Sequence, residues 1–153
     1  MNLTTYLIEA HIFRIVENHL EFLLLKRSDN EIYPGLWQMV TGSIDGEEKA
    51  YQTAIREIKE ETGLAPQRFW VVPNVNSFYS EKLDEICMIP VFTALVAKTS
   101  EVTISEEHSE FRWVNKDEAI SLLAWTGQRT SVEIINDYFM NHPHFLKFVE
   151  ISL

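Results

Sequence analysis

The hydrophobic pattern of the first forty residues is typical of strands. Residues 5–16 and 20–26 are rich in β-branched, aromatic and aliphatic side chains, and the polar residues 17–19 separate them. This arrangement predicts a β-hairpin with its turn at residues 17–19. Residues 33–35, Tyr-Pro-Gly, predict a turn, and residues 37–40 predict a short strand after it.

The pattern changes to a helical period at residue 50. In a helix, successive side chains are about 100° apart around the axis. On this basis one side of the helix is an apolar stripe, and the opposite side consists of Glu48, Gln52, Arg56 and Lys59. Gly63 follows the last expected helical residue, as a left-handed C-cap requires. The sequence therefore predicts an amphipathic helix that packs on a core through Ala50, Tyr51, Ala54, Ile55 and Ile58.

The second half of the chain alternates strand and helix signals. Apolar runs predict strands at residues 69–78, 85–97 and 111–114, with a weakly alternating strand at residues 145–153. Residues 115–118 resemble a helix N-terminus, and a last helix is expected over residues 131–140, ending near residues 141–143. Strands on both sides of a central helix, with a second helix later, predict an α/β fold: an α/β/α sandwich around a mixed sheet.

Composition and charge narrow the class of protein. The 153 residues, 46% hydrophobic and without a linker or repeat, predict one domain over residues 1–153. The formal net charge of −10 argues against nucleic acid or an anionic membrane as the partner. The single Cys87 cannot form an intrachain disulfide, and no transmembrane segment or signal pattern is evident, so a cytoplasmic location is expected.

Three carboxylates of the central helix are the main chemical signal. Glu57, Glu60 and Glu61 lie at spacings that bring side chains to one helix face. Glu57 and Glu60 border the apolar stripe, whereas Glu61 falls within it, where an unpaired carboxylate is costly. A Glu-rich surface helix would be the ordinary interpretation, but the position of Glu61 favours a cation site with oxygen ligands and water, suited to Mg²⁺ or Mn²⁺.

The same segment resembles the Nudix box, Gly-x5-Glu-x7-Arg-Glu-U-x-Glu-Glu-x-Gly-U, in which U is a bulky aliphatic residue. Every specified position is filled without a gap, by Gly42, Glu48, Arg56, Glu57, Ile58, Glu60, Glu61, Gly63 and Leu64. The resemblance implies the α/β/α sandwich predicted above and a metal-dependent hydrolase. It also implies a metal site formed by the Gly42 carbonyl, Glu57, Glu60, Glu61 and a glutamate outside the box.

Glu107 is the preferred candidate for the glutamate outside the box, with Glu106 as the fallback and a solvated acidic loop as the alternative. As metal ligand or general base, Glu107 would act with Glu57 and Glu60 in catalysis. Arg56 would orient these carboxylates by reaching back toward Glu48, and Gly42 and Gly46 would permit a tight loop and a close backbone approach. Without the box, Arg56 would be interpreted as an ordinary surface cation.

Substrate contacts are expected from one cation and several aromatic residues. Arg27, at the end of the second strand next to Lys26, suits bidentate phosphate binding, although a surface pair capping the hairpin is nearly as good an interpretation. Aromatic side chains could stack on a flat base or pterin, although most aromatic residues of a small domain belong to its core. The candidates are Trp37, Tyr79 and Trp113, with Tyr33 and Phe78.

The function predicted from these features is a Mg²⁺-dependent pyrophosphohydrolase. Its substrate is a small-molecule phosphoanhydride, a nucleoside diphosphate linked to another moiety, with a nucleoside or pterin triphosphate preferred and monophosphate and pyrophosphate as products. Residues 37–43 and 125–129 are similar to the family branch that includes dihydroneopterin triphosphate and dATP pyrophosphohydrolases.

Several alternatives remain open at this stage. ADP-ribose, a dinucleoside polyphosphate or a nucleotide sugar could be the substrate. The chain could also be a catalytically silent ligand-binding module of the same fold, or the acidic helix could be a structural Ca²⁺ or protein-interaction site. The apolar N-terminal strands could form a homodimer contact.

Overall fold

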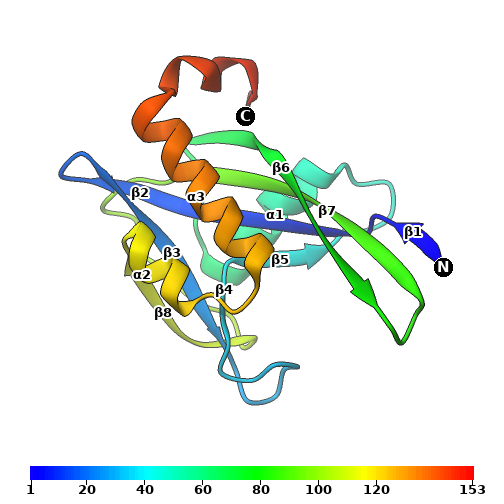
Figure 1. Ribbon diagram of the computed structural model, residues 1–153. Coiled ribbons are helices and arrows are strands. Elements are labelled where there is room, and N and C mark those ends of the chain that lie inside the picture. Colours follow the sequence, from blue (N-terminus) through cyan, green and yellow to red (C-terminus); the bar gives the residue numbers. More distant parts are fainter.

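One mixed sheet with helices on both faces forms the structure, a computed structural model that describes residues 1–153 (Figure 1). The strands are β1 (Asn2–Thr4), β2 (Leu7–Val16), β3 (His19–Arg27), β4 (Trp37–Gln38), β5 (Val40–Ser43), β6 (Arg68–Ser80), β7 (Glu85–Leu95), β8 (His108–Val114) and β9 (Glu150–Ile151). The helices are α1 (Ala50–Thr62), α2 (Lys116–Leu122), α3 (Thr126–Asn141) and the 3-10 helix η1 (Pro143–Phe148). The predicted α/β sandwich around a mixed sheet is confirmed.

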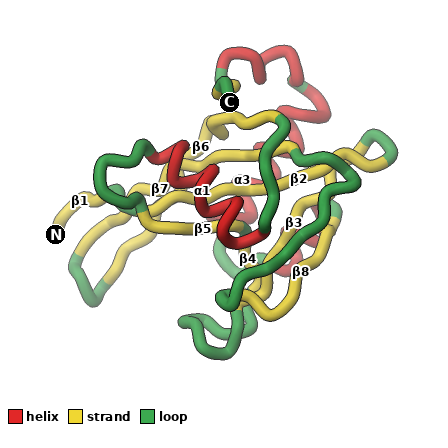
Figure 2. Tube along the Cα trace, turned by 180° about the vertical axis from the view of Figure 1, so that it is seen from behind, coloured by secondary structure: helices red, strands yellow, loops and turns green.

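Strands β2 and β7 pair in parallel at the centre of the sheet. The main order is β4-β3-β2-β7-β6-β9, while β1 pairs with β7, β5 with β2 and β8 with β3. Most other neighbours are antiparallel, so the sheet is mixed. Helix α1 lies on one face of the sheet, the face turned toward the reader in Figure 2. Helices α2 and α3 lie on the other face.

The predicted hairpin between β2 and β3 is confirmed. Val16 pairs with His19, so the loop consists of Glu17 and Asn18. Their φ angles are 50° and 64°, the left-handed values that a two-residue type I′ hairpin turn needs.

Four element boundaries differ from the sequence-based expectation. Helix α3 begins at Thr126 rather than residue 131, because its N-cap, Trp125, offers no side-chain bond and Gly127 weakens the local helix signal. Strand β8 begins at His108, since the pairing with β3 continues through polar residues. The strand expected at residues 37–40 is two strands, because the chain changes partner from β3 to β2. Residues 145–153 form most of η1 and the short β9 rather than one strand.

Alternation along β2 divides the core into two layers. Ile8, Ala10 and Ile12 face α1, where Ala54 and Ile58 are fully buried, as the helical stripe predicts. Phe13 belongs to the other layer, beneath α2 and α3, which contains Trp70, Val91, Val132 and Ile135. Each face of the sheet is therefore covered by a helix whose apolar side the sequence pattern specifies.

A buried polar cluster interrupts the second layer under the first turns of α3. Glu9 and His11 are 2% and 1% exposed, and their side chains meet at 2.6 Å (Oε2 to Nε2). Asn76 donates to the other Glu9 oxygen at 3.0 Å. Burial alone would raise the pKa of Glu9, but the hydrogen bonds and charge of His11, with Asn76, hold it below its usual value. Glu9 is thus a stable anion beneath the start of α3.

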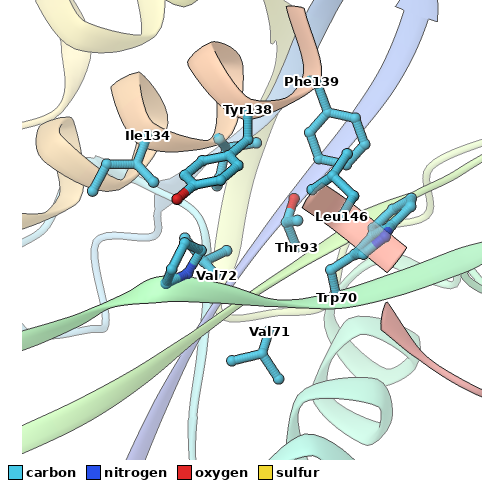
Figure 3. Close-up of a pocket in the computed structure, with 10 residues that line it drawn as sticks. Trp70, Val71, Val72, Thr93, Ile134, Tyr138, Phe139 and Leu146 are labelled. Atoms are coloured by element: carbon cyan, nitrogen blue, oxygen red, sulfur yellow. The ribbon is translucent and has the colours of Figure 1, made fainter. Parts of the chain in front are cut away.

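An apolar crevice between α3 and β6 lies apart from the box helix (Figure 3). Eight of its ten lining residues are hydrophobic, and in the figure Tyr138 and Phe139 of α3 stand over Trp70 and Val72. It contains none of the acidic residues and is a packing defect of the second layer. None of the helices is long and apolar enough to cross a membrane.

Gly127 of α3 lies directly against the side chain of Asn76 in β6. An added Cβ at Gly127 would overlap the amide of Asn76, which must then turn away from buried Glu9. Gly127→Ala should therefore lower the free energy of unfolding by about 1 kcal/mol, because the lost hydrogen bond outweighs the gain in helix propensity. In an Asn76→Ala background the same change should be neutral or stabilising by up to about 1 kcal/mol. Urea denaturation of the four proteins measures the reversal; equal effects in both backgrounds would contradict the contact.

Candidate active site

Helix α1 presents the box glutamates at a well-defined C-terminus. Gly63 has φ of 72°, and its amide donates to the Lys59 carbonyl, so the predicted left-handed C-cap is confirmed. The next segment is tied to the helix end, because the amides of Thr103 and Ser105 donate to the carbonyls of Thr62 and Glu61 at 2.9 and 3.3 Å. The segment that leads to Glu107 therefore runs directly past the carboxylates.

Arg56 connects the acidic side chains around the helix. Its guanidinium binds Glu48 in a bidentate manner, with 2.9 Å from Nε and 3.0 Å from a terminal nitrogen, and also donates to Glu57 (2.9 Å) and Glu60 (3.1 Å). Hydrogen bonds from Arg56 and Thr53 lower the pKa of Glu48 to about 2, and the bond to Glu48 raises the pKa of Arg56. The expected reach of Arg56 back to Glu48 is confirmed, and the guanidinium fixes the orientation of Glu57.

Glu61 is enclosed as its place in the apolar stripe predicts. It is 1% exposed, and neither carboxylate oxygen has a hydrogen-bond partner. Burial, together with the charges of Glu107 and Glu57, raises its pKa to about 9, which the charge of Arg27 only partly offsets. Burial also raises the pKa of Glu57, against the effect of Arg56.

Gly42 serves a different purpose from the tight loop that the sequence suggested. It lies inside β5, opposite Ile8, and an added Cβ would overlap the side chain of Glu57. The absent side chain lets Glu57 pack against the β5 backbone. The predicted close backbone approach thus holds for Gly42, and the predicted tight loop holds for Gly46, which has φ of 53°.

A chain of polar contacts extends from Glu61 to Arg27. The Nε2 atom of buried His108 lies 3.7 Å from Glu61 Oε1 and accepts from the Gln38 amide at 3.1 Å. Gln38 in turn accepts from Arg27 at 3.1 Å. Burial, with the charge of Arg27, lowers the pKa of His108 to about 4, so this imidazole is neutral near pH 7.

Glu107 and Arg27 are brought near the box glutamates. Glu107 is exposed, and its charge raises the pKa of both Glu61 and Glu57. Its carbonyl accepts from the Ser28 amide at 3.0 Å, immediately after Arg27. Glu106 is also exposed, whereas Glu60 is more than half exposed and contacts Arg56. The metal and general-base roles of these residues stay predictions.

The predicted aromatic contacts are dispersed. Arg112 lies over the ring of Trp37 at 4.8 Å, and Arg14 lies over the ring of Trp113 at 4.3 Å. Tyr79 donates its hydroxyl to Asp84 at 3.0 Å within the β6–β7 hairpin. Their roles in substrate binding stay predictions, and no contact joins any of the three rings to the carboxylates of α1.

Sequence reasoning missed Gln38. It is 9% exposed and links His108 to Arg27. A glutamine in a short strand gives no signal of its own. The pairing of Gln38 with Leu25 and of His108 with Arg27 across β3 creates the contact, and that register is visible only in three dimensions.

The residues present suit a hard divalent cation. The orphaned oxygens of Glu61, beside the charges of Glu57 and Glu107, form an anionic cluster that requires positive charge. No three His, Cys, Asp or Glu side chains converge on one point as a closed metal shell. An ion that keeps part of its water shell and binds one or two carboxylates directly, as Mg²⁺ does, therefore fits the donors better than an ion that needs a full protein cage.

The sequence and the fold are similar to those of known proteins. The NUDIX domain model matches residues 5–138. The chain is 28% identical over 112 residues to the nucleoside triphosphatase NudI of Klebsiella pneumoniae, covering 68% of this chain and 79% of that protein. A NUDIX hydrolase structure from Listeria monocytogenes superposes with a TM-score of 0.76 at 29% identity, covering 89% of this chain and 94% of that one. An Ap4A hydrolase of C. elegans shares the fold, with a TM-score of 0.75 at 21% identity over 88% of this chain and 96% of that one.

The enclosed carboxylate of Glu61 predicts a pH-dependent stability of the metal-free protein. Its pKa of about 9 lies above the ordinary 4.5, so the folded state holds this proton more tightly, and the free energy of unfolding falls as the pH rises between these values. Relative to Glu61→Gln, the parent should lose on the order of 2–3 kcal/mol by pH 7. Denaturation with a chelator at pH values from about 5 to about 9 measures the difference; parallel profiles for the two proteins would contradict it.

The contact of Gly42 with Glu57 predicts coupling between these positions. Gly42→Ala should lower the free energy of unfolding by about 1–3 kcal/mol, because the new methyl group overlaps the Glu57 side chain. In a Glu57→Ala background, Gly42→Ala should lower the free energy of unfolding by less than half as much. A double-mutant cycle followed by chemical denaturation gives the coupling energy. A coupling near zero would show that Glu57 does not occupy the space above Gly42.

Proposed function

The chain belongs to the NUDIX domain family of hydrolases, and from that premise we propose that it is a Mg²⁺-dependent pyrophosphohydrolase of a nucleoside or pterin triphosphate. The observation that supports this proposal most directly is the buried Glu61 carboxylate without a hydrogen-bond partner. A fold that tolerates such a group gains from a bound cation. Nudix hydrolases generally use divalent metal ions.

In this proposal Glu57 and Glu61 would bind the cation directly, and Glu60, the Gly42 carbonyl and Glu107 would contribute to the site through its bound water. When bound, a divalent cation supplies charge neutralisation for two phosphates and makes a water molecule more acidic. Arg56 keeps Glu57 in the required orientation through its bonds to Glu48 and Glu57.

Glu107 is the proposed proton acceptor. Its carboxylate is exposed, close enough to the cluster to influence the pKa of Glu61, and free to take a proton from an attacking water. Glu57 is the alternative, although its bond to Arg56 at 2.9 Å occupies one oxygen. In-line attack on a phosphorus then releases a monophosphate and pyrophosphate from a triphosphate.

The substrate class is supported by the NudI relatives, which are nucleoside triphosphatases, and by the positive charge of Arg27 beside the cluster. In a chain with a net charge of −10, Arg27 and the bound cation are the groups that attract phosphate. The proposed partner is therefore a small phosphoanhydride rather than nucleic acid. The proposed location is the cytoplasm, consistent with a single, buried and unpaired Cys87.

The test is hydrolysis of a substrate panel with and without Mg²⁺. It should include the common nucleoside triphosphates, dihydroneopterin triphosphate, ADP-ribose, a dinucleoside polyphosphate and a nucleotide sugar, with phosphate and pyrophosphate measured separately. A triphosphate should be the best substrate, with pyrophosphate as product and activity lost with a chelator.

Glu61→Gln should reduce kcat by at least about a hundredfold. It should leave the thermal midpoint equal or higher, because the amide needs no proton at neutral pH, whereas the buried carboxyl must take one up on folding. Glu133→Gln, a change of an exposed glutamate on α3, is the matched control and should keep parental activity. Parental turnover by Glu61→Gln would overturn the proposed role of the cluster.

A further inference from the structure

Two exposed aromatic rings meet where the loop after β3 reaches the start of α3. Tyr33, in the loop of residues 28–36, and Trp125, the residue before α3, lie 5.7 Å apart between ring centroids at 71°, edge to face. They are 56% and 50% exposed. About half of the surface of each residue is therefore accessible to a ligand.

The loop that holds Tyr33 is fastened to the carboxylate cluster. Its first residue, Ser28, donates its amide to the Glu107 carbonyl at 3.0 Å. The Arg27 guanidinium donates both to the carbonyl of Ile32, next to Tyr33, and to Gln38. Gln38 contacts His108, which lies 3.7 Å from Glu61. Two separate routes of contacts thus fix the position of the Tyr33 loop relative to the glutamates.

The backbone at Tyr33 is strained. Its φ angle is 52°, in the left-handed region that bulky residues rarely adopt. Glycine or asparagine would be more comfortable at this position. Strain of this kind persists where the surrounding structure imposes it, and it is frequently associated with a functional side chain.

The other candidate rings are less available. A cation already lies over Trp37 and over Trp113, and both residues are partly buried. The hydroxyl of Tyr79 is bonded to Asp84 in a hairpin with no contact to the cluster. Phe78 precedes Tyr79 in the same hairpin. The Tyr33 hydroxyl has no such bond, and its loop contacts Glu107 through the Ser28 amide.

We propose that Tyr33 and Trp125 form the contact for the flat ring of the substrate, a nucleobase or pterin, when its phosphates lie at the carboxylate cluster. This inference rests on the proposed function and names the part of the structure that selects the substrate. Arg27 holds the Tyr33 loop through its ion pair with Glu31 at 3.5 Å and its bond to the Ile32 carbonyl. A flat ring stacks on either aromatic side chain without a requirement for particular hydrogen bonds.

The test compares Tyr33→Asn with Tyr33→Phe on the best triphosphate substrate in Mg²⁺. Asparagine removes the ring but accepts the left-handed backbone, so Tyr33→Asn should have an equal or higher thermal midpoint. It should raise KM by about tenfold or more with kcat within about twofold, because stacking contributes to binding rather than to bond cleavage. Tyr33→Phe keeps the ring and should match the parent. Trp125→Ala should raise KM as Tyr33→Asn does.

Phe148→Ala, which removes a ring of 75% exposure on η1, is the control for loss of an exposed aromatic residue and should leave KM unchanged. A parental KM for Tyr33→Asn, or an equal increase for Phe148→Ala, overturns the proposal. If the parent cleaves none of the panel, the proposed function fails separately. The ring contact is then judged by calorimetry with a non-hydrolysable nucleoside triphosphate analogue and Mg²⁺: a Kd at least tenfold weaker for Tyr33→Asn supports it, and an equal Kd overturns it.

Discussion

The buried Glu61 carboxyl group in the C-terminal half of α1, which has no hydrogen-bond partner, is the constraint on which the candidate site depends. Glu61 is 1% exposed without a hydrogen bond to either oxygen, and the charges of Glu107 and Glu57 raise its pKa further. The charge of Arg27 offsets only part of this effect on the pKa of Glu61. Arg56 instead binds Glu48, Glu57 and Glu60 on the outer side of the helix. In the proposed function, a bound cation supplies the positive charge at Glu61.

The sheet supports this arrangement from below. Gly42 lets the β5 backbone lie against Glu57. Ala54 and Ile58 of α1 pack on the apolar surface of the sheet, at whose centre β2 and β7 pair in parallel. On the other face, α3 begins over the buried Glu9, His11 and Asn76. The layer that packs on α1 and the layer that packs on α3 thus share strand β2, which fixes the two helices relative to each other.

Much of the fold and the acidic cluster could be predicted from the sequence, because both depend on local periodicity. The period of α1 placed Glu61 in the apolar stripe, and Arg56 within reach of Glu48. The start of α3 could not be predicted, because Gly127 weakens the helix signal there. The reason for a glycine at this position is its close contact with Asn76, fifty-one positions earlier in the chain. Gln38 was missed for the same reason: its contacts with Arg27 and His108 depend on strand register. The contact of Tyr33 with Trp125 likewise joins a loop to a helix start that is distant in sequence.

The central claim is that the Glu57 and Glu61 carboxylates are direct ligands of a divalent cation. The most direct measurement is a crystal structure of the protein with Mn²⁺ and a non-hydrolysable triphosphate analogue, with anomalous diffraction collected at the manganese edge. The account predicts an anomalous peak about 2.0–2.3 Å from carboxylate oxygens of both glutamates and also in contact with the phosphates. Phosphates bound with no anomalous peak at these carboxylates, or a peak held only by exposed residues elsewhere, would contradict it.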